Sequence, residues 1–201
     1  MALKIFYTQG KIEAGCDEAG RGCLAGPVIA AAVVLPADFK WPSLNDSKKM
    51  TEREREQAEP FIKENAIAWA IGVVDHLQID QINILNASIL AMQRALDQLK
   101  IIPEQILVDG NRFKKYKSIP HHCIVKGDGK YAAIAAASVL AKVERDRVMK
   151  KLHDQYPLYA WSKNKGYPTR DHREAIKKYG TCEYHRLTFN LLGDNQLSLD
   201  L

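Results

Sequence analysis

The stretch GCDEAGRGCLAGP, residues 15–27, sets two adjacent acids and a glycine–arginine–glycine triplet inside otherwise apolar sequence. On either side, residues 12–19 and 27–35 have the apolar character of strands, and the glycine-rich stretch predicts a hairpin between them. Successive side chains of a strand point to opposite faces of its sheet. Asp17 and Glu18 can therefore serve one site only if the strand ends or bulges at the glycines, or if Glu18 takes a more peripheral position.

The rest of the chain alternates between helix and strand patterns. Thr51 is a favourable N-cap for a charged helix that runs to about residue 65. Further strands are expected at 66–74, 105–110 and 122–129, and further helices at 79–99 and at about 131–155. This order predicts one α/β domain over residues 1–192, a mixed sheet flanked by helices, with a helical C-terminal segment from about 157 to 192 and a flexible tail at 193–201.

Composition indicates a soluble protein with a basic second half. The 201 residues carry a net charge of +5, but residues 1–100 hold 11 basic and 13 acidic groups, whereas residues 101–201 hold 18 and 11. Basic clusters interleaved with aromatics, such as NRFKKYK and WSKNKGY, favour a polyanionic partner such as nucleic acid, although a solvated surface explains them equally well. The longest apolar run, 28–35, is too short to cross a bilayer, and the N-terminus lacks a signal peptide, so a cytoplasmic protein is expected. A monomer is the default expectation for a basic chain of this kind.

The four cysteines are expected to be reduced thiols in a reducing compartment. They form no CxxC pair and no zinc-ribbon spacing. The segments HHC (121–123) and CEYH (182–185) each hold potential ligands without clear partners, which argues against zinc. Cys16 adjoins Asp17, but no histidine pairs with it in the sequence, so we interpret it as a core residue rather than a nucleophile.

Four carboxylates stand among apolar residues: Asp17, Glu18, Asp109 and Asp128. Asp109 and Asp128 come at the carboxyl ends of their predicted strands, the edge where α/β sheets usually carry their sites. Gathered in space, the acids would raise one another's pKa, and a divalent cation would remove that penalty. Oxygen-only ligands favour Mg²⁺ or Mn²⁺ over zinc, and two such ions are common machinery for phosphodiester cleavage. The alternative is that each acid is a turn residue or a cap, since DG and GDG are common turns.

The glycine-rich stretch matches no common nucleotide-binding motif. A Walker A loop needs GxxxxGK followed by Ser or Thr, and the spacing of Gly20, Gly22 and Gly26 is one residue too long for the dinucleotide fingerprint. What remains is a loop whose backbone can approach a ligand closely, with Arg21 beside it. Such a loop fits a minor-groove contact in which backbone groups bond to a 2′-hydroxyl.

Six motifs occur in the order found in one family: DEAGRG, LNDSKKM, ILVDGN, VKGD, AASVLAKVERD and NKGYPT. On these motifs, the chain resembles bacterial ribonuclease HII, the type 2 ribonuclease H, from about Gly15 to Phe189. The resemblance implies a ribonuclease H-like mixed five-stranded sheet, which agrees with the strand pattern. It also implies an endonuclease that hydrolyses the RNA strand of RNA–DNA hybrids and nicks on the 5′ side of single ribonucleotides in duplex DNA, leaving 5′-phosphate and 3′-hydroxyl ends.

The same resemblance implies a two-metal site for Mn²⁺ or Mg²⁺. Its ligands match Asp17, Glu18, Asp109 and Asp128, which are also the catalytic residues. We expect Asp17 and Asp109 to be the main ligands, with Glu18 and Asp128 completing the site. Because deprotonation of the attacking water is then the metal's task, no nucleophilic side chain is expected.

Substrate recognition is likewise implied by the resemblance. Gly20, Arg21 and Gly22 match the triplet that reads the junction between a ribonucleotide and the following deoxynucleotide. Tyr167 matches a tyrosine that packs on the sugar at that junction. Many relatives have proline where this chain has Cys23, a small residue that should leave the loop usable.

Two lysines are candidate contacts to backbone phosphates. Lys48 lies in the LNDSKKM motif close to Asn45 and Ser47, and Lys142 follows Ser138 by four residues on one predicted helical face. An ordinary surface position explains each lysine equally well.

Three other residues have competing interpretations. Asp146 follows Lys142 by one helical turn, which favours an ion pair with that lysine over a fifth ligand role. His172 and His185 fall in the basic C-terminal segment, where they either line a groove or are structural, as most isolated histidines are.

The last six residues, QLSLDL, resemble the hexapeptide by which bacterial proteins dock on the replicative sliding clamp. In that interpretation Gln196 bonds in the clamp's groove, and three leucines fill apolar pockets: Leu197, Leu199 and Leu201. The alternative is a frayed tail, or a strand end packed on its own domain.

Two other functions compete with the ribonuclease prediction. A different two-metal nuclease with the same fold, such as a junction resolvase or a nuclease confined to long hybrids, would use the same acids. A hybrid-binding module without activity would use them only as structural groups.

Overall fold

The computed structural model describes residues 3–41 and 43–193. Its strands form one mixed sheet in the order β3-β2-β1-β4-β5. The strands are β1 (Glu13–Ala19), β2 (Val28–Val34), β3 (Ala68–Val74), β4 (Gln105–Asp109) and β5 (His121–Ile124). β2 is antiparallel to both β1 and β3, whereas β4 is parallel to both β1 and β5. The predicted β1–β2 hairpin and the predicted five-stranded mixed sheet are both confirmed.

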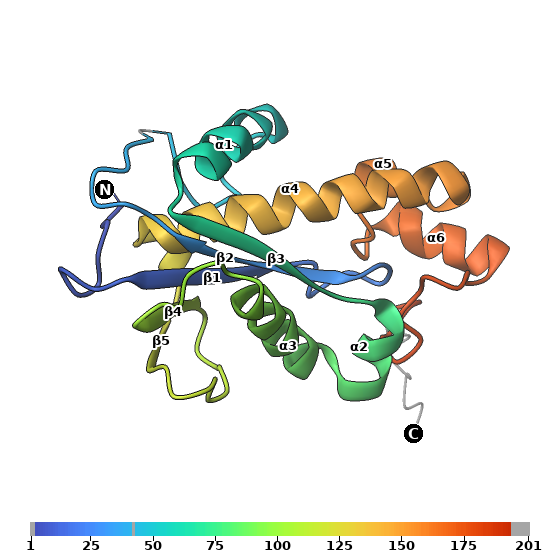
Figure 1. The fold of residues 1–201 in the computed structure, drawn as a ribbon. Helices are drawn as coiled ribbons and strands as arrows, with labels where there is room; N and C mark the ends of the chain where they lie inside the picture. The colour runs from blue at the N-terminus through green and yellow to red at the C-terminus, as the bar shows by residue number, and fades with distance from the viewer. Residues whose placement is uncertain (1–2, 42, 194–201) are drawn as a thin grey trace, which may run out of the picture.

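Helices cover both faces of this sheet (Figure 1). α4 (Ala132–Gln155) lies across one face with α1 (Glu52–Asn65) beside it. α3 (Ile84–Asp97) packs on the other face, and the short helix α2 (His76–Ile82) precedes it in the chain and contacts it. The apolar core is divided accordingly. One buried cluster joins the α4 face of the sheet to α1 and α4, and a second joins the opposite face to α2 and α3.

The N-terminus of α1 forms as the sequence predicts. The Thr51 side chain accepts a hydrogen bond from the Glu54 N–H, and the Glu54 carboxylate accepts one from the Thr51 N–H at 2.7 Å. This reciprocal capping box satisfies two N–H groups that the first turn of the helix leaves unpaired.

The prediction of one continuous helix at 79–99 is wrong, because the structure has two helices that meet at Asn83. Asn83 has a φ of 64°, and its side chain accepts a hydrogen bond from the Asn86 N–H at 3.1 Å. Asparagine tolerates the left-handed region better than most residues, and its short side chain caps the helix that follows. The apolar spacing of the sequence continues across Asn83, so the pattern did not reveal the break between the two helices.

Two other predicted boundaries are corrected. β5 ends at Ile124, so Asp128 lies beyond the strand, in the short 3₁₀ helix η1 (Gly127–Gly129). The C-terminal segment is helical only in part: η2 (Pro157–Tyr159), α5 (Trp161–Asn164) and α6 (Arg170–Tyr179), with no helix over residues 180–193. In the described ranges no helix is both long and apolar enough to cross a membrane.

The first residue of the opening stretch is a glycine because α4 approaches β1 closely there. A Cβ placed on Gly15 would lie 2.2 Å from the Ala133 carbonyl carbon and 2.4 Å from the Ile134 nitrogen. These are backbone atoms of α4, which cannot turn aside as a flexible side chain can. Gly15 therefore fixes the height of α4 above the strand that carries Asp17.

We predict that Gly15→Ala lowers the free energy of unfolding by about 2 kcal/mol or more, since overpacking of a tight contact typically costs about 1–3 kcal/mol. Urea denaturation monitored by circular dichroism measures the change. Gly129→Ala is the matched control, because a Cβ on Gly129 meets no atom within 4 Å. Equal midpoints for the two variants would contradict the packing argument.

Candidate active site

Three carboxylates meet at one edge of the sheet. Asp17 is near the carboxyl end of β1, Asp109 ends the parallel neighbour β4, and Asp128 lies in η1 just beyond β5. Each offers one ligand oxygen, and these oxygens all lie within 4.8 Å of one another. In the part of the chain that the structure describes, no other set of three or more such side chains could hold a metal ion.

Hydrogen bonds from neighbouring groups fix these acids. One Asp17 oxygen accepts the Glu18 N–H at 2.7 Å, and one Asp109 oxygen accepts the Gly127 N–H at 2.7 Å. The Ser138 hydroxyl of α4 also bonds to Asp17. The last two bonds tie β4 to η1 and β1 to α4, so the positions of the acids depend on packing between different elements.

Glu18 leaves β1 on the face opposite to Asp17, as the alternation of the strand requires. It lines a cleft on the α3 side together with Asp109 and Arg21, and its carboxylate accepts a hydrogen bond from Arg21 at 3.2 Å. Glu18 does not belong to the set of three close acids. Its place matches the peripheral position that the sequence left open.

The electrostatics of the acids are unfavourable without a cation. Burial raises the pKa of Asp17, and the nearby carboxylates of Glu18 and Asp109 raise it further. Burial, together with Asp109 and Asp46, raises the pKa of Asp128 to about 6. Burial also raises the pKa of Glu18, although Arg21 opposes the shift. Carboxyl groups held this close to each other are what a divalent cation stabilises.

The loop that precedes α1 brings two further charges to the acids. Burial acts to lower the pKa of Lys48, but the carboxylates of Asp17 and Asp46 outweigh it and raise the pKa. The Ser47 hydroxyl lies 2.8 Å from that of Ser138. Lys48 thus lies close enough to the acids for their charges to act on it. Asp46 was missed in the sequence, since nothing in a polar loop shows which of its side chains turns inward.

Lys142 is held by the acid one turn along α4. Its ammonium lies 2.6 Å from Asp146, which also pairs with Arg55 of α1 at 3.6 Å. Arg55 in turn donates to the Ser47 and Met50 carbonyls. The predicted ion pair between Asp146 and Lys142 is confirmed, and it continues into the loop that carries Lys48.

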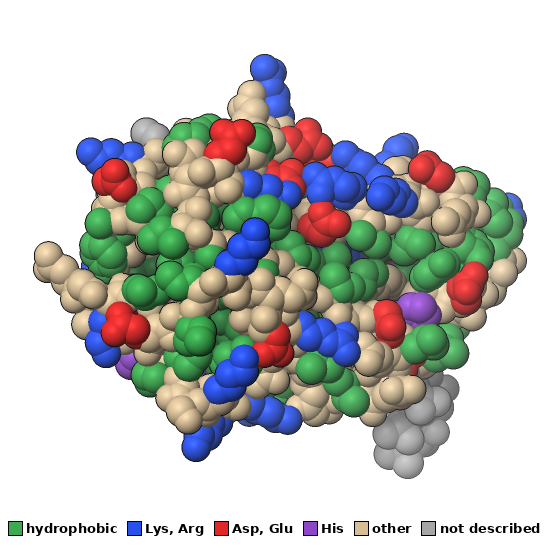
Figure 2. Space-filling view, viewed as in Figure 1, with side chains coloured by type: hydrophobic (Ala, Val, Ile, Leu, Met, Phe, Trp, Pro, Cys, Tyr) green, Lys and Arg blue, Asp and Glu red, His purple; other side chains and the backbone are tan. Residues whose placement is uncertain are grey.

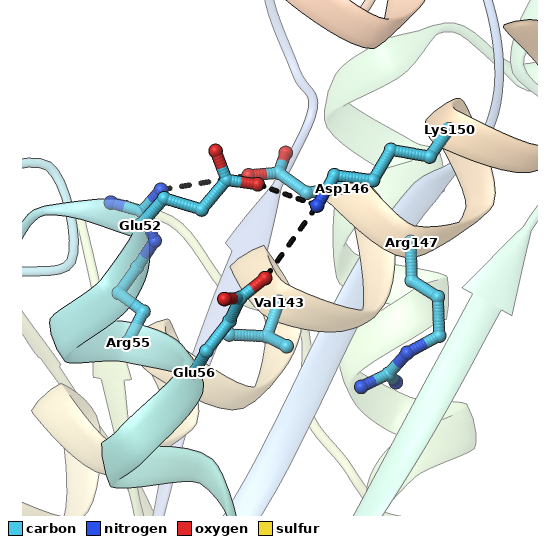
Figure 3. A pocket seen from close by; sticks show the side chains of 7 residues that line it. All are labelled: Glu52, Arg55, Glu56, Val143, Asp146, Arg147 and Lys150. Carbon is cyan, nitrogen blue, oxygen red and sulfur yellow. Dashed lines mark ion pairs between the residues drawn. The ribbon is translucent and has the colours of Figure 1, made fainter.

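Figure 3 shows the α1 side of this network, in the pocket between α1 and α4. Arg55 points from α1 toward Asp146, and Lys150 reaches from α4 to Glu52 and Glu56. On the face drawn in Figure 2, lysine and arginine side chains are interspersed with acidic ones rather than joined into one basic surface. The basic residues seen over α1 and α4 thus serve in part to hold the two helices together.

The glycine loop, defined here as residues 20–27, lies against the Tyr167 turn, residues 164–167. The Leu24 N–H donates to the Gly166 carbonyl at 2.7 Å. Lys142 lies over the Tyr167 ring, with its ammonium 5.8 Å from the ring centre. Segments about 140 residues apart in the sequence therefore form one surface. It contains the predicted glycine triplet, Tyr167 and one of the two predicted lysines.

Gly20 and Gly22 are glycines for different reasons. Gly20 has a φ of 99°, and a Cβ there would lie 2.0 Å from the Arg145 Nε, so both backbone and packing require glycine. Gly22 has neither constraint, since its φ is outside the left-handed region and a Cβ would meet no atom within 4 Å. Open space at Gly22 is what close approach of a ligand to the backbone would need.

The remaining candidates divide into core residues and residues outside the described ranges. His172 and His185 do not line a groove, because their exposed fractions are 0% and 1%. Cys16 is buried within the core, as predicted, and all four cysteines are free. The predicted clamp-binding residues, Gln196, Leu197, Leu199 and Leu201, lie outside the described residues.

Solved structures with the same architecture define the class of protein. The chain superposes on ribonuclease H2 from Pyrococcus horikoshii OT3 with a TM-score of 0.73 and 27% identity, over 90% of this chain and 94% of that one. A structure of Bst-RNase HIII gives a TM-score of 0.71 at 20% identity, over 90% and 68% of the two chains, which shows the fold alone. The protein has the ribonuclease H-like fold.

Sequence relatives place the chain within that class. The family model of ribonuclease HII matches residues 14–192. Ribonuclease HII of Bacteroides thetaiotaomicron is 62% identical over 97% of this chain and 98% of the relative, and that of Bacteroides fragilis is 62% identical over 94% of each. The chain belongs to the ribonuclease HII family and is a ribonuclease H hydrolase, so the resemblance seen in its motifs is confirmed.

We predict that Asp128→Asn stabilises the metal-free protein at pH 8. The native pKa of about 6 exceeds the ordinary value of about 3.9, so the native state binds more protons than the unfolded state between these values. The contribution of Asp128 to stability therefore rises as pH falls through this window, and its ionised carboxylate is destabilising above it. The variant should melt a few degrees higher at pH 8, and the difference should vanish near pH 4.

Thermal melts in the presence of a chelator measure this effect. The exposed Asp38 offers a control, since Asp38→Asn should change the melting temperature equally little at both pH values. A lower melting temperature for Asp128→Asn at pH 8 would show that its carboxylate stabilises the site even without a metal.

Proposed function

We propose that the protein is a metal-dependent endonuclease that hydrolyses the RNA strand of RNA–DNA hybrids and nicks duplex DNA on the 5′ side of single ribonucleotides. The observation that supports this most directly is the set of three buried or half-buried acids beside the glycine loop. Family membership supports the ribonuclease activity. The proposed products carry 5′-phosphate and 3′-hydroxyl ends.

The acids are proposed to bind Mn²⁺ or Mg²⁺. Asp17, Asp109 and Asp128 supply oxygen ligands only, and burial and mutual repulsion raise the pKa values of Asp17 and Asp128 in a way that a cation would reverse. Glu18 completes the site from the α3 face. When bound, two such ions lower the pKa of the attacking water and stabilise the leaving oxygen. A structure with the same fold, at 19% identity, is that of Bst-RNase HIII in complex with Mn²⁺.

The protein's own residues would orient the duplex on these acids. Lys48 and Lys142 are proposed to contact phosphates, since one faces the acids and the other lies over the Tyr167 ring. Arg21 extends from the glycine loop with just over half of its side chain exposed, although it is paired with Glu18. A charged group that is exposed beside a buried site is available to a phosphate.

The identity of the sugar would be read by the glycine loop and Tyr167. The open space at Gly22 leaves backbone groups of the Gly20, Arg21 and Gly22 triplet accessible to a 2′-hydroxyl. Tyr167 is partly exposed on the adjoining turn, where its ring can pack on the sugar of the next nucleotide. The contact between the loop and the turn explains how two adjacent sugars could be examined together.

We predict that the purified protein nicks a labelled DNA duplex immediately 5′ to its single ribonucleotide, with Mn²⁺ or Mg²⁺ and not with a chelator. Asp109→Asn should reduce the rate by about 10³-fold or more while leaving duplex binding intact, because it removes a charged oxygen of the metal site and keeps the side chain's shape. Gel electrophoresis measures cleavage, and fluorescence anisotropy measures binding.

Other outcomes of this assay correspond to the competing functions. Cleavage of long hybrids without a nick at the single ribonucleotide would identify a nuclease confined to hybrids. Tight binding with no cleavage under either metal would identify a hybrid-binding module. Asp38→Asn serves as a control with an unchanged rate.

We also propose that the C-terminal QLSLDL binds the replicative sliding clamp. Its sequence has glutamine first and leucine at its second, fourth and sixth positions. A structure of the same fold, at 24% identity and a TM-score of 0.74, is that of the PCNA:RNase HII complex from Archaeoglobus fulgidus. That complex supports the proposal by showing a clamp bound to a protein of this fold.

Deletion of residues 196–201 should weaken binding to the bacterial clamp at least tenfold, because both the glutamine contact and the leucine contacts are lost. Surface plasmon resonance measures the affinity. Ser198→Ala changes a position between the proposed anchors and should leave the affinity nearly unchanged. Equal affinities of the full-length and deleted chains would contradict the proposal.

A further inference from the structure

Two arginines lie completely buried behind the glycine loop. Arg145 of α4 and Arg186 of the C-terminal segment each have an exposed fraction of 0%. A buried charge is costly unless its donors are satisfied. Within the described residues neither guanidinium forms an ion pair with a carboxylate. Backbone carbonyls accept their donors instead, except at the buried Arg186 Nη2, which has no hydrogen-bond partner.

Arg145 bonds to the glycine loop and to the Tyr167 turn at the same time. Its Nε donates to the Pro27 carbonyl at 3.0 Å, and its Nη2 donates to the Ala25 carbonyl at 3.1 Å. Its Nη1 donates to the Lys165 carbonyl at 2.8 Å. One planar side chain thus joins two segments that are remote in the sequence.

Arg186 holds the outer part of the same loop. Its Nε donates to the Gly26 carbonyl at 3.0 Å, and its Nη1 donates to the Arg21 carbonyl at 3.1 Å. Its backbone N–H donates to the Leu24 carbonyl at 2.8 Å. The exposed side chain of Arg21 therefore starts from a backbone that is fixed from beneath.

Glycines in the loop and in the turn leave room for the Arg145 guanidinium and for close contact between the two segments. A Cβ on Gly20 would overlap Arg145, and a Cβ on Gly166 would lie 2.8 Å from the Ala25 carbonyl oxygen. Both glycines face inward, unlike Gly22. Their absent side chains allow the close contact between Arg145, the loop and the turn.

A pair of buried histidines supports the turn from the other side. His172 Nδ1 lies 3.0 Å from the Tyr167 carbonyl, which can only accept, so Nδ1 carries the proton. The bare Nε2 then accepts from Trp161 at 3.0 Å and from His185 at 3.2 Å. His185 immediately precedes Arg186, so one short segment supports both the glycine loop and the Tyr167 turn.

We propose that Arg145 and Arg186 are positioning residues for ribonucleotide recognition: they lock the glycine loop to the Tyr167 turn, and so fix Arg21 relative to Tyr167. The inference rests on the proposed function, in which these two elements examine adjacent sugars. Neither arginine touches the substrate. Each acts through the backbone of the loop that does.

Lysine substitutions test this role, because lysine keeps the charge but lacks the planar fork that joins several carbonyls. In Arg145→Lys and Arg186→Lys, we expect the kcat/KM ratio of single-ribonucleotide DNA to long RNA–DNA hybrid to fall at least tenfold. The Mn²⁺-induced rise in melting temperature should stay as in the wild type. A merely structural role would lower activity on both substrates together and leave their ratio unchanged.

Two arginines that do not contact the glycine loop provide the matched controls. Arg147 lies two residues after Arg145 on α4 and pairs with Glu59 and Glu144. Arg173 lies on α6 and donates to the Asn190 carbonyl. The control variants are Arg147→Lys and Arg173→Lys. Neither is bonded to the glycine loop, so the substrate ratio should be unchanged. All assays are run below the melting temperature of the least stable variant.

Amide hydrogen exchange separates failure of this inference from failure of the proposed function, since it needs no substrate. In the wild type the Leu24 and Tyr167 amides should exchange through one shared opening, and in both lysine variants both should exchange at least tenfold faster while Leu107 is unchanged. The wild-type measurement holds even if a variant does not fold. Independent opening of the two amides, or an unchanged substrate ratio in folded variants, would overturn the inference.

A wild-type protein that never nicks at a single ribonucleotide would instead overturn the proposed function. The exchange result would then still decide whether the two arginines lock the loop to the turn.

Discussion

Parallel pairing of β1 with β4 puts Asp17 and Asp109 at the same edge of the sheet, and the rest of the site is arranged around that pairing. A parallel neighbour cannot follow through a tight turn, so the chain between them must cross over and adds β3, α2 and α3 on the way. The antiparallel hairpin of β1 with β2 occupies the other side of β1. β1 is therefore the central strand of the sheet, and this position buries the acids that it carries.

Bringing like charges together opposes folding, and the surrounding structure has to hold them in place. Backbone N–H groups and the Ser138 hydroxyl satisfy individual oxygens of Asp17 and Asp109, while Lys48 approaches from the neighbouring loop. These contacts offset only part of the repulsion, since the pKa values of Asp17 and Asp128 stay raised. Asp17 and Asp128 are therefore easier to protonate than ordinary aspartates, which is the electrostatic signature of acids held close together.

The sequence predicted what depends on local pattern and missed what depends on distant packing. Alternation along β1 correctly separated Asp17 from Glu18, which lines the cleft on the α3 side, and an apolar run located Asp109 at the end of β4. The break at Asn83 was missed, because a left-handed residue leaves the apolar spacing intact. Arg145 and Arg186 were missed because an arginine in a basic segment resembles a surface residue, and their carbonyl partners lie up to 165 residues away. Contacts between residues so far apart produce no periodic pattern in the sequence.

One helix, α4, supports both the acids and the glycine loop. Ser138, which bonds to Asp17, and Arg145, which bonds to the glycine loop, are seven residues apart on α4, or about 10 Å along the helix axis. If the acids cleave the phosphodiester and the glycine loop recognises the sugar, α4 fixes the distance between these two sites. Inserting a single residue between these positions would shift the helix by about 1.5 Å and rotate it by about 100°. The length of α4 between these positions would then set the distance between the sugar that is recognised and the phosphodiester that is cut.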